Sequence, residues 1–206
     1  NIDSTAPTTT ASAPGDWNNH DLTISLSADD ALSGVKATHY TLDGGAQQTG
    51  TSLSISAGGV HTLEFWSVDK ADNVEAAKTV QVKIDKTPPA INHSQSPAAN
   101  ANGWSNSDVT VTFTCSDAQS GIASCTDSQT LTTEGKDQPV TGTAEDNAGN
   151  KTTDPATVSI DKTDPTISAS ADRAANANGW YSGATSPHDY AAKAKATVAR
   201  GFTALE

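Results

Sequence analysis

The chain has 206 residues, a net charge of −12 and only 34% hydrophobic residues. An acidic chain without a basic stripe argues against nucleic acid and against anionic membrane surfaces, because both would repel it. No apolar run is long enough to cross a bilayer, so we expect no membrane insertion. Divalent cations are the natural partners of so many carboxylates.

One segment recurs and organises the whole chain. Residues 82–89 (V-K-I-D-K-T-P-P) return as 158–165 (V-S-I-D-K-T-D-P), and a shortened copy opens the chain at 1–7. Each copy has the pattern of a strand end followed by a link that proline stiffens. The spacing predicts one repeat over 1–84, a second over 85–160 and a partial third over 161–206, as a piece of a longer string of repeats.

The first repeat shows short strands separated by turn signals. Leu22, Ile24 and Leu26 alternate with polar residues, as in a half-buried strand. Further strands are predicted over 35–42, 52–56, 61–68 and 79–84, with a hairpin turn at 43–45. The second repeat has the same landmarks in the same order. About six or seven short strands in 75–80 residues predict an all-β fold of two tandem Ig-like β-sandwiches.

The third copy begins in the same way and then changes character. Residues 176–180 repeat the N-A-N-G-W segment of 100–104, but no strand pattern follows. Instead Ser186 and Pro187 suit a helix start, while Tyr190, Ala194 and Val198 share one helical face. A short C-terminal helix is therefore predicted over 187–200. Whether it is a natural cap or a foreign tail stays open.

Four motifs together resemble a known family. They are the I-D-x-T-x-P link, the A-N-G-W entry, the D-x-x-S-G-[VI] loop and the D-x-A-x-N loop, and they cover about residues 1–182. The set resembles the bacterial Ig-like repeats that occur in tandem in secreted enzymes, adhesins and cell-surface proteins. That resemblance implies an extracellular or cell-surface location. It leaves the function open, because such modules act as spacers, ligand binders or adhesive surfaces.

Two cysteines lie in the second repeat. Cys115 and Cys125 have no histidine beside them at zinc-ligand spacing, which argues against a metal thiolate site. We expect a disulfide that joins the end of one strand to the start of the next as a local staple. Such a bond indicates an oxidising, extracellular compartment.

The aspartate loops offer a candidate metal site. In an Ig-like sandwich the N-terminus and two of the loops lie at one end. This would bring together Asp85, Asp117 and Asp146, with a second set in the first repeat, Asp3, Asp30 and Asp69. Carboxylates that converge would repel one another unless a cation such as Ca²⁺ neutralised them. Simple turn formation by Asp, Asn and Gly explains the same residues.

A once-per-repeat tryptophan offers the other candidate site. Trp17, Trp104 and Trp180, the last followed by Tyr181, lie outside the alternating core pattern. Exposed aromatic rings at this spacing could stack on the sugar rings of a polysaccharide or cell-surface glycan. The favoured alternative is that each Trp covers the end of its own sandwich.

Catalysis has little support in the sequence. No G-x-S-x-G motif is present, and the five histidines are scattered. We therefore expect no enzyme, but a non-catalytic extracellular stalk or spacer, with adhesion as a further role and neighbouring repeats as its partners. The alternative is a carbohydrate-binding module that uses the tryptophans.

Overall fold

A computed structural model describes residues 2–167 and 177–178. Contacts group the chain into two compact units, Asn1–Ile160 and Asp161–Glu206. The regular secondary structure of the described residues consists of β-strands joined by turns and loops. These residues include no helix that could span a membrane. The predicted helix over 187–200 lies outside the described residues.

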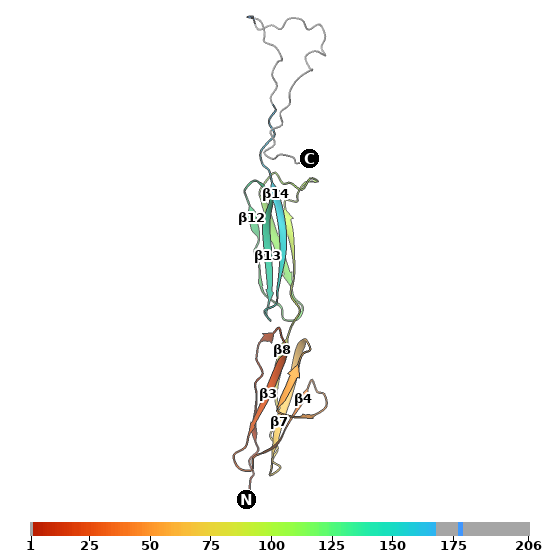
Figure 1. The fold of residues 1–206 in the computed structure, drawn as a ribbon, viewed down its shortest axis with the longest axis vertical. Helices are drawn as coiled ribbons and strands as arrows, with labels where there is room; N and C mark the ends of the chain where they lie inside the picture. Colours follow the sequence, from red (N-terminus) through yellow and green to blue (C-terminus); the bar gives the residue numbers. More distant parts are fainter. Residues whose placement is uncertain (1, 168–176, 179–206) are drawn as a thin grey trace. The chain divides into compact units, whose positions relative to one another are not determined.

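The strands up to Ile84 form what we call the first sandwich (Figure 1). One sheet has three strands in the order β1 (Thr8–Ala11), β3 (Leu22–Asp29) and β6 (Ser52–Ile55). The other sheet has five, in the order β2 (Trp17–Asn18), β8 (Lys78–Ile84), β7 (Gly59–Asp69), β4 (Val35–Leu42) and β5 (Gln48–Thr49). All pairs are antiparallel except β2 with β8.

The core of the first sandwich lies between these two sheets. Leu22, Ile24 and Leu26 point inward from β3, as their alternation predicted, and meet Leu63 and Phe65 from β7. Since every second residue of these strands is apolar, one face of each sheet is dry and the other stays wet.

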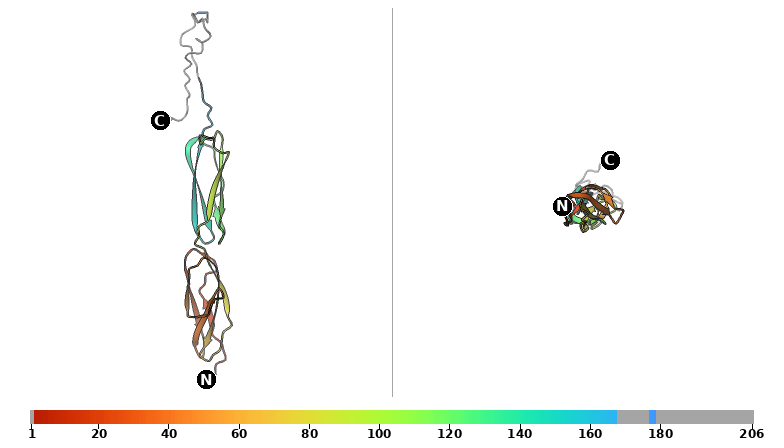
Figure 2. Two further views of the ribbon diagram at one scale, coloured as in Figure 1. Left: turned by 90° about the vertical axis from the view of Figure 1, so that its right-hand side faces the viewer. Right: turned by 90° about the horizontal axis from the view of Figure 1, so that it is seen from below.

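The strands from Ala90 to Ile160 form the second sandwich (Figure 2). Its first sheet has the order β12 (Gln129–Leu131), β10 (Val109–Ser116) and β9 (Ala90–Ser96). Its second sheet has the order β11 (Ile122–Cys125), β13 (Gly135–Asp146) and β14 (Lys151–Ile160). A separate core again fills the space between the sheets, with Val109, Val111, Phe113, Val140, Val158 and Ile160.

Both sandwiches share one strand order. Apart from the two-residue strands β2 and β5, each sandwich has six strands: the first, second and fourth form one sheet, and the third, fifth and sixth form the core of the other, as in Ig-like folds. The prediction of an all-β, Ig-like fold is confirmed. The division of residues 1–160 into two domains at 84/85 stays a prediction, because contacts place them in one unit.

The two cores fill equivalent space with different side chains. Leu26 and Phe65 lie inside the first sandwich, whereas the corresponding strand positions in the second hold Phe113 and Gly142. A Cβ on Gly142 would collide with the Phe113 ring. The large ring has therefore moved from one sheet to the other, and a glycine compensates for its volume.

Candidate functional site

Three aspartates from separate elements meet at one end of the second sandwich. Asp85 follows β8, Asp117 follows β10 and Asp146 ends β13. One carboxylate oxygen of each lies within 4.8 Å of the others. Asp85 and Asp146 are buried, and Asp117 is half-buried. The fold thus brings together the three residues that the sequence pattern selected.

Turn chemistry holds two of these carboxylates in place. Oδ1 of Asp117 accepts the backbone N–H groups of Ser120 and Gly121, both at 2.8 Å. Oδ1 of Asp146 accepts the N–H groups of Ala148 and Asn150, both at 2.9 Å. An aspartate that binds the backbone of its own loop fixes that loop, which explains the D-x-x-S-G and D-x-A-G-N patterns.

The third carboxylate ties the incoming link to these loops. Asp85 accepts N–H from Thr87 at 2.9 Å and, with its other oxygen, from Ser120 at 3.0 Å. The Asn150 amide donates to the backbone oxygen of Asp85 at 2.8 Å and to Oδ2 of Asp146 at 2.7 Å. Asn150 is thus the residue that closes the cluster around the link.

The first sandwich contains the same cluster. Asp3, Asp30 and Asp69 also offer oxygens within 4.8 Å of one another. Ser33 N–H donates to Asp3 at 2.9 Å, and the Asn73 amide donates to the backbone oxygen of Asp3 at 3.2 Å and to Asp69 at 2.7 Å. The third link begins in the same way, because Thr163 N–H donates to Asp161 at 3.0 Å.

Hydrogen bonds lower the pKa of three of these carboxylates, those of Asp117, Asp69 and Asp3. Burial raises the pKa of Asp117, but the N–H groups of Gly121, Gln119 and Ser120 outweigh it and leave the pKa below its ordinary value. Burial likewise opposes the hydrogen bonds from Asn73 at Asp69, whose pKa is lowered on balance. N–H groups from Thr5 and Ser33 lower the pKa of Asp3. Backbone dipoles therefore supply part of the neutralisation that the sequence argument assigned to a cation.

The clusters fit the donor preference of calcium. Ca²⁺ takes six to eight oxygen ligands, and three carboxylates with nearby loop carbonyls are a suitable set. An ion there would have to share oxygens that already accept N–H groups. Calcium binding at Asp85, Asp117 and Asp146, and more weakly at Asp3, Asp30 and Asp69, stays a prediction.

Two further residues hold the link, and the sequence analysis missed both. Lys86 Nζ donates to Oδ1 of Asp21 and to the backbone oxygen of Ser56, each at 2.6 Å. Gln119 Nε2 donates to the backbone oxygen of Ile84 at 2.5 Å. A signal for Lys86 was available, since the I-D-K-T motif places Lys162 at the same position in the next copy.

The disulfide is present but spans more than was expected. Cys115 and Cys125 are bonded, which confirms the pairing. The expectation of a local staple at the start of the next strand is wrong, because Cys125 is the last residue of β11. Since β10 and β11 belong to different sheets, the bond joins the two layers of the second sandwich.

Two of the described tryptophans, Trp17 and Trp104, lie beside strand ends. Trp17 pairs with Lys83 as part of β2, and Trp104 precedes Ser105, which bridges Ile160 in the same parallel manner. Both indole side chains are half-buried, whereas Trp180 and Tyr181 lie outside the described residues. Sugar binding by these residues stays a prediction, and the placement of Trp17 and Trp104 agrees with a covering role.

Comparisons with known proteins add little beyond the fold. No protein-family model and no curated protein matches the chain. Among solved structures, the chain is similar to the fibronectin(III)-like modules of Clostridium thermocellum CbhA, at 16% identity and a TM-score of 0.40. The match covers 74% of this chain and 95% of that one. So distant a likeness carries no argument about activity or partners.

Proposed function

We propose that this chain is a non-catalytic extracellular spacer within a larger bacterial surface or secreted protein. Two tandem Ig-like repeats, 1–84 and 85–160, form it, and a third begins at 161. Its mechanism is mechanical: each repeat is fastened to the link that precedes it, so that the repeats hold an attached module away from its anchor.

The observation that carries this proposal is the way the link is held from both sides. Asp85 and Thr87 face the second sandwich, where Ser120 and Asn150 bind them. Lys86, between them, faces the first sandwich and binds Asp21 and Ser56. The side chains of Asp85 and Lys86 are thus committed to opposite neighbours, and the backbone N–H of Asp85 also donates to the Asn18 oxygen of the first sandwich at 2.9 Å. Together these contacts remove the freedom that a flexible linker would keep.

Two further observations support the proposal. The Cys115–Cys125 disulfide suits an oxidising compartment. Most of the clustered carboxylate oxygens accept hydrogen bonds from their own loops, so these groups are engaged in holding structure and are poorly placed to act as acids or bases.

The test compares the tumbling of the two sandwiches by ¹⁵N relaxation. In the wild type we expect the two sandwiches to share one rotational correlation time. In the double variant Lys86→Ala/Gln119→Ala we expect each sandwich to have a shorter correlation time of its own. Lys136→Ala, an exposed lysine away from the link, is the control. Independent tumbling in the wild type would contradict the spacer mechanism.

A carbohydrate-binding function is tested separately. The wild type and Trp104→Ala are applied to a glycan array and to insoluble polysaccharides. A spacer is expected to bind neither. Retention of the wild type that Trp104→Ala abolishes would replace the spacer with the carbohydrate-binding alternative.

A further inference from the structure

We propose that the surface formed by Ile2, Leu32 and Val74 in the first sandwich is a docking surface for the C-terminal end of another Ig-like repeat, and that this joint is apolar where the joint at Asp85 is polar. The inference rests on the proposed spacer function and names the partner of the N-terminal end of the first sandwich.

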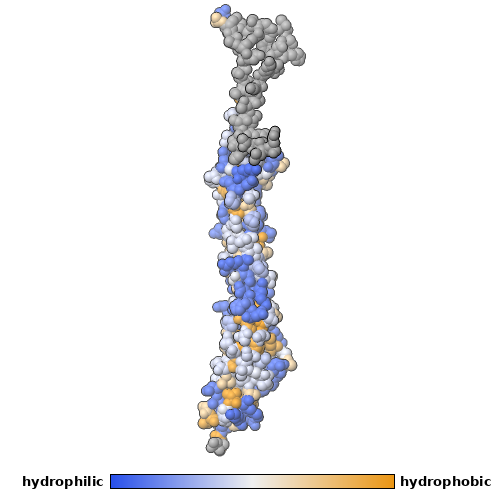
Figure 3. All heavy atoms as spheres, in the orientation of Figure 1, coloured by the Kyte–Doolittle hydropathy of each residue, from blue (hydrophilic) through white to orange (hydrophobic). Residues whose placement is uncertain are grey.

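Three exposed apolar side chains gather around the first aspartate cluster. Ile2 precedes Asp3, Leu32 lies in the loop between Asp30 and Ser33, and Val74 follows Asn73. Their exposed fractions are 94%, 72% and 58%. Figure 3 shows hydrophobic residues at this N-terminal end of the first sandwich. Since the cluster's hydrogen bonds draw the link and both loops together, the three side chains share one end of the fold.

The equivalent surface of the second sandwich is already in use. Leu32 corresponds to Gln119, because each lies two residues after the loop aspartate and just before Ser-Gly. Gln119 donates to the strand-end oxygen of Ile84, and its side chain lies against Gly58 in the turn before β7. Gly149, in the other loop, lies near Asn19 of the first sandwich. The same two loops therefore form the receiving face of an existing joint.

The partner is recognised by this chemistry. A C-terminal end like that of the first sandwich offers a strand that ends in isoleucine and a glycine turn that exposes backbone and Cα atoms. Leu32 cannot donate a hydrogen bond to a strand-end oxygen. It would instead stabilise the joint by packing its apolar side chain against the glycine turn. Ile2 takes the position of Ile84, which is fully buried at the end of β8. A repeat that supplies this strand would bury Ile2 in the same way.

The experiment extends the full chain at its N-terminus with a second copy of residues 1–84, joined so that Ile84 of the added copy replaces Ile2. A soluble paramagnetic probe then reports the exposure of the Leu32 and Val74 methyl groups and of the Gln119 side-chain amide. We expect the effect of the probe on Leu32 and Val74 to fall by about half or more on extension, because a docked interface excludes solvent. In Leu32→Asp the Val74 methyls should stay as accessible as in the unextended chain.

Two controls make the outcome decisive. Leu32→Asp in the unextended chain should leave its melting temperature unchanged, since the side chain is exposed there. Leu32 and Val74 that stay fully accessible after extension, while Gln119 is protected, would overturn the docking surface and leave the spacer function standing. An accessible Gln119 amide in both proteins would instead contradict the spacer function itself.

Discussion

The two sandwiches fasten their sheets together at the same place by different chemistry. In the second, Cys115 of β10 is bonded to Cys125 of β11. The corresponding positions of the first are Ala28 and Thr38, because Thr38 pairs with Ser67 as Cys125 pairs with Ala144. There a buried polar network replaces the covalent bond.

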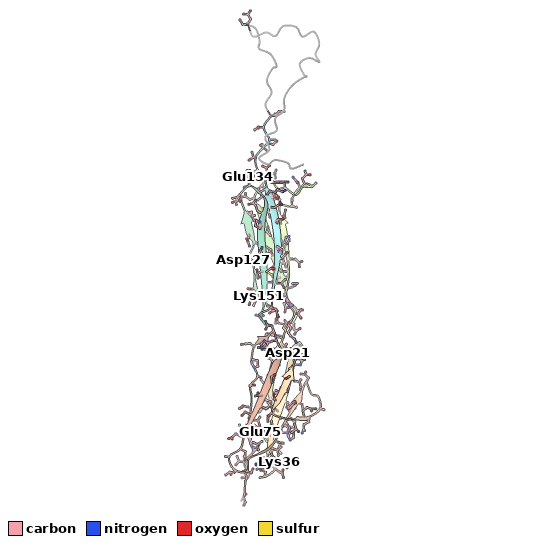
Figure 4. All side chains as sticks on the ribbon, in the orientation of Figure 1. Asp21, Lys36, Glu75, Asp127, Glu134 and Lys151 are labelled. Atoms are coloured by element: carbon pink, nitrogen blue, oxygen red, sulfur yellow. A yellow bond between two sulfur atoms is a disulfide. The ribbon has the colours of Figure 1, made fainter. Side chains whose placement is uncertain are left out.

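Glu75 is the centre of that network (Figure 4). It accepts Thr9 N–H at 2.8 Å and Ser67 N–H at 3.2 Å, and Lys78 pairs with it at 2.6 Å. The Thr9 hydroxyl bonds the Ser67 hydroxyl at 2.7 Å, which joins β1 of one sheet to β7 of the other. Burial raises the pKa of Glu75, but Lys78 and Thr9 outweigh it, so the pKa is lowered and the group stays charged.

Both sandwiches therefore have a cross-connection between their sheets, but the fold accepts more than one kind of chemistry for it. A sandwich of about 80 residues buries a modest apolar surface, so its core alone gives only marginal stability. One sequence meets this need with a covalent bond that the compartment permits, and the other with hydrogen bonds to a buried charge. The two should therefore fail under different conditions.

The largest effect is expected at Glu75. Glu75→Ala leaves the Thr9 and Ser67 N–H groups without their acceptor and leaves the Lys78 ammonium with the Thr9 oxygen but without a counter-charge. This should cost about 3 kcal/mol of unfolding free energy in the first sandwich. Chemical denaturation followed at Trp17 and Trp66 measures it. Thr152→Ala, at the matching position of the second sandwich, is the control. An effect below that of the control would mean that the network does not join the sheets.

Reduction of the disulfide should destabilise only the second sandwich. Loss of this short cross-link is expected to cost about 2–3 kcal/mol through the entropy of the unfolded chain. The amide signals of β10 and β13 should then melt earlier with dithiothreitol, and those of β3 and β7 should not. The double variant Cys115→Ala/Cys125→Ala should show the same loss without reductant. Equal shifts in both sandwiches would break the comparison.

Calcium tests whether the two aspartate clusters act alike. Millimolar calcium against a chelator is expected to raise the stability of the second sandwich by about 1 kcal/mol at a concentration several times the Kd, with a smaller gain in the first. Asp117→Ala should abolish the gain in the second sandwich, and Asp30→Ala should abolish the gain in the first sandwich. Without a shift in the wild type, or with an equal shift in Asp117→Ala, the backbone N–H groups alone neutralise the clusters.

A pH effect is expected at His61 in the first sandwich. His61 bonds Asp43 at 2.7 Å and the Ala57 oxygen at 3.0 Å, and the pair raises the pKa of His61 while it lowers that of Asp43. A raised histidine pKa gives stability that is complete below about pH 6.5 and is lost as pH rises through the folded value.

The exposure of Asp43 limits the size of this pH effect, and the second sandwich supplies the control. Asp43 is about half exposed, so the gain should be under about 1 kcal/mol. Gln138 holds the equivalent turn through the Thr133 oxygen at 3.0 Å, and it does not titrate. His61→Gln should therefore remove the loss of stability between pH 6 and 8.5. A first sandwich that is equally stable at both pH values in the wild type would refute this.

The smallest effect is expected at Asp72, where the two sandwiches share a backbone conformation but have different residues. Asp72 has φ of 65°, and Gly149 has φ of 88° at the same position of the second sandwich. Asp72→Gly should stabilise the first sandwich by about 0.5 kcal/mol, because glycine adopts this region without strain. Its pair with Lys36 is exposed on both sides and contributes little. Lys36→Ala is the control for the lost pair, and a net loss in Asp72→Gly would show that the pair matters more than the strain.

Local patterns determined much of this protein. Alternation at Leu22, Ile24 and Leu26 placed a strand correctly, and the predicted strand over 35–42 has the bounds of β4. The aspartates that converge were selected from loop motifs together with the loop placement expected of an Ig-like sandwich. The short strands β1, β2 and β5 were missed, since two to four residues without apolar alternation give no strand signal.

Only the tertiary structure decided what lies across the two sheets. Nothing in the spacing of Cys115 and Cys125 tells that β10 and β11 lie in different layers. No pattern in the sequence singled out Glu75, because its donor Thr9 lies 66 residues away. The roles of Lys86 and Gln119 also depend on groups that are distant in sequence, Asp21 and Ile84. Pairing within a strand or turn leaves a periodic trace in the sequence, whereas contact between layers depends on packing and leaves none.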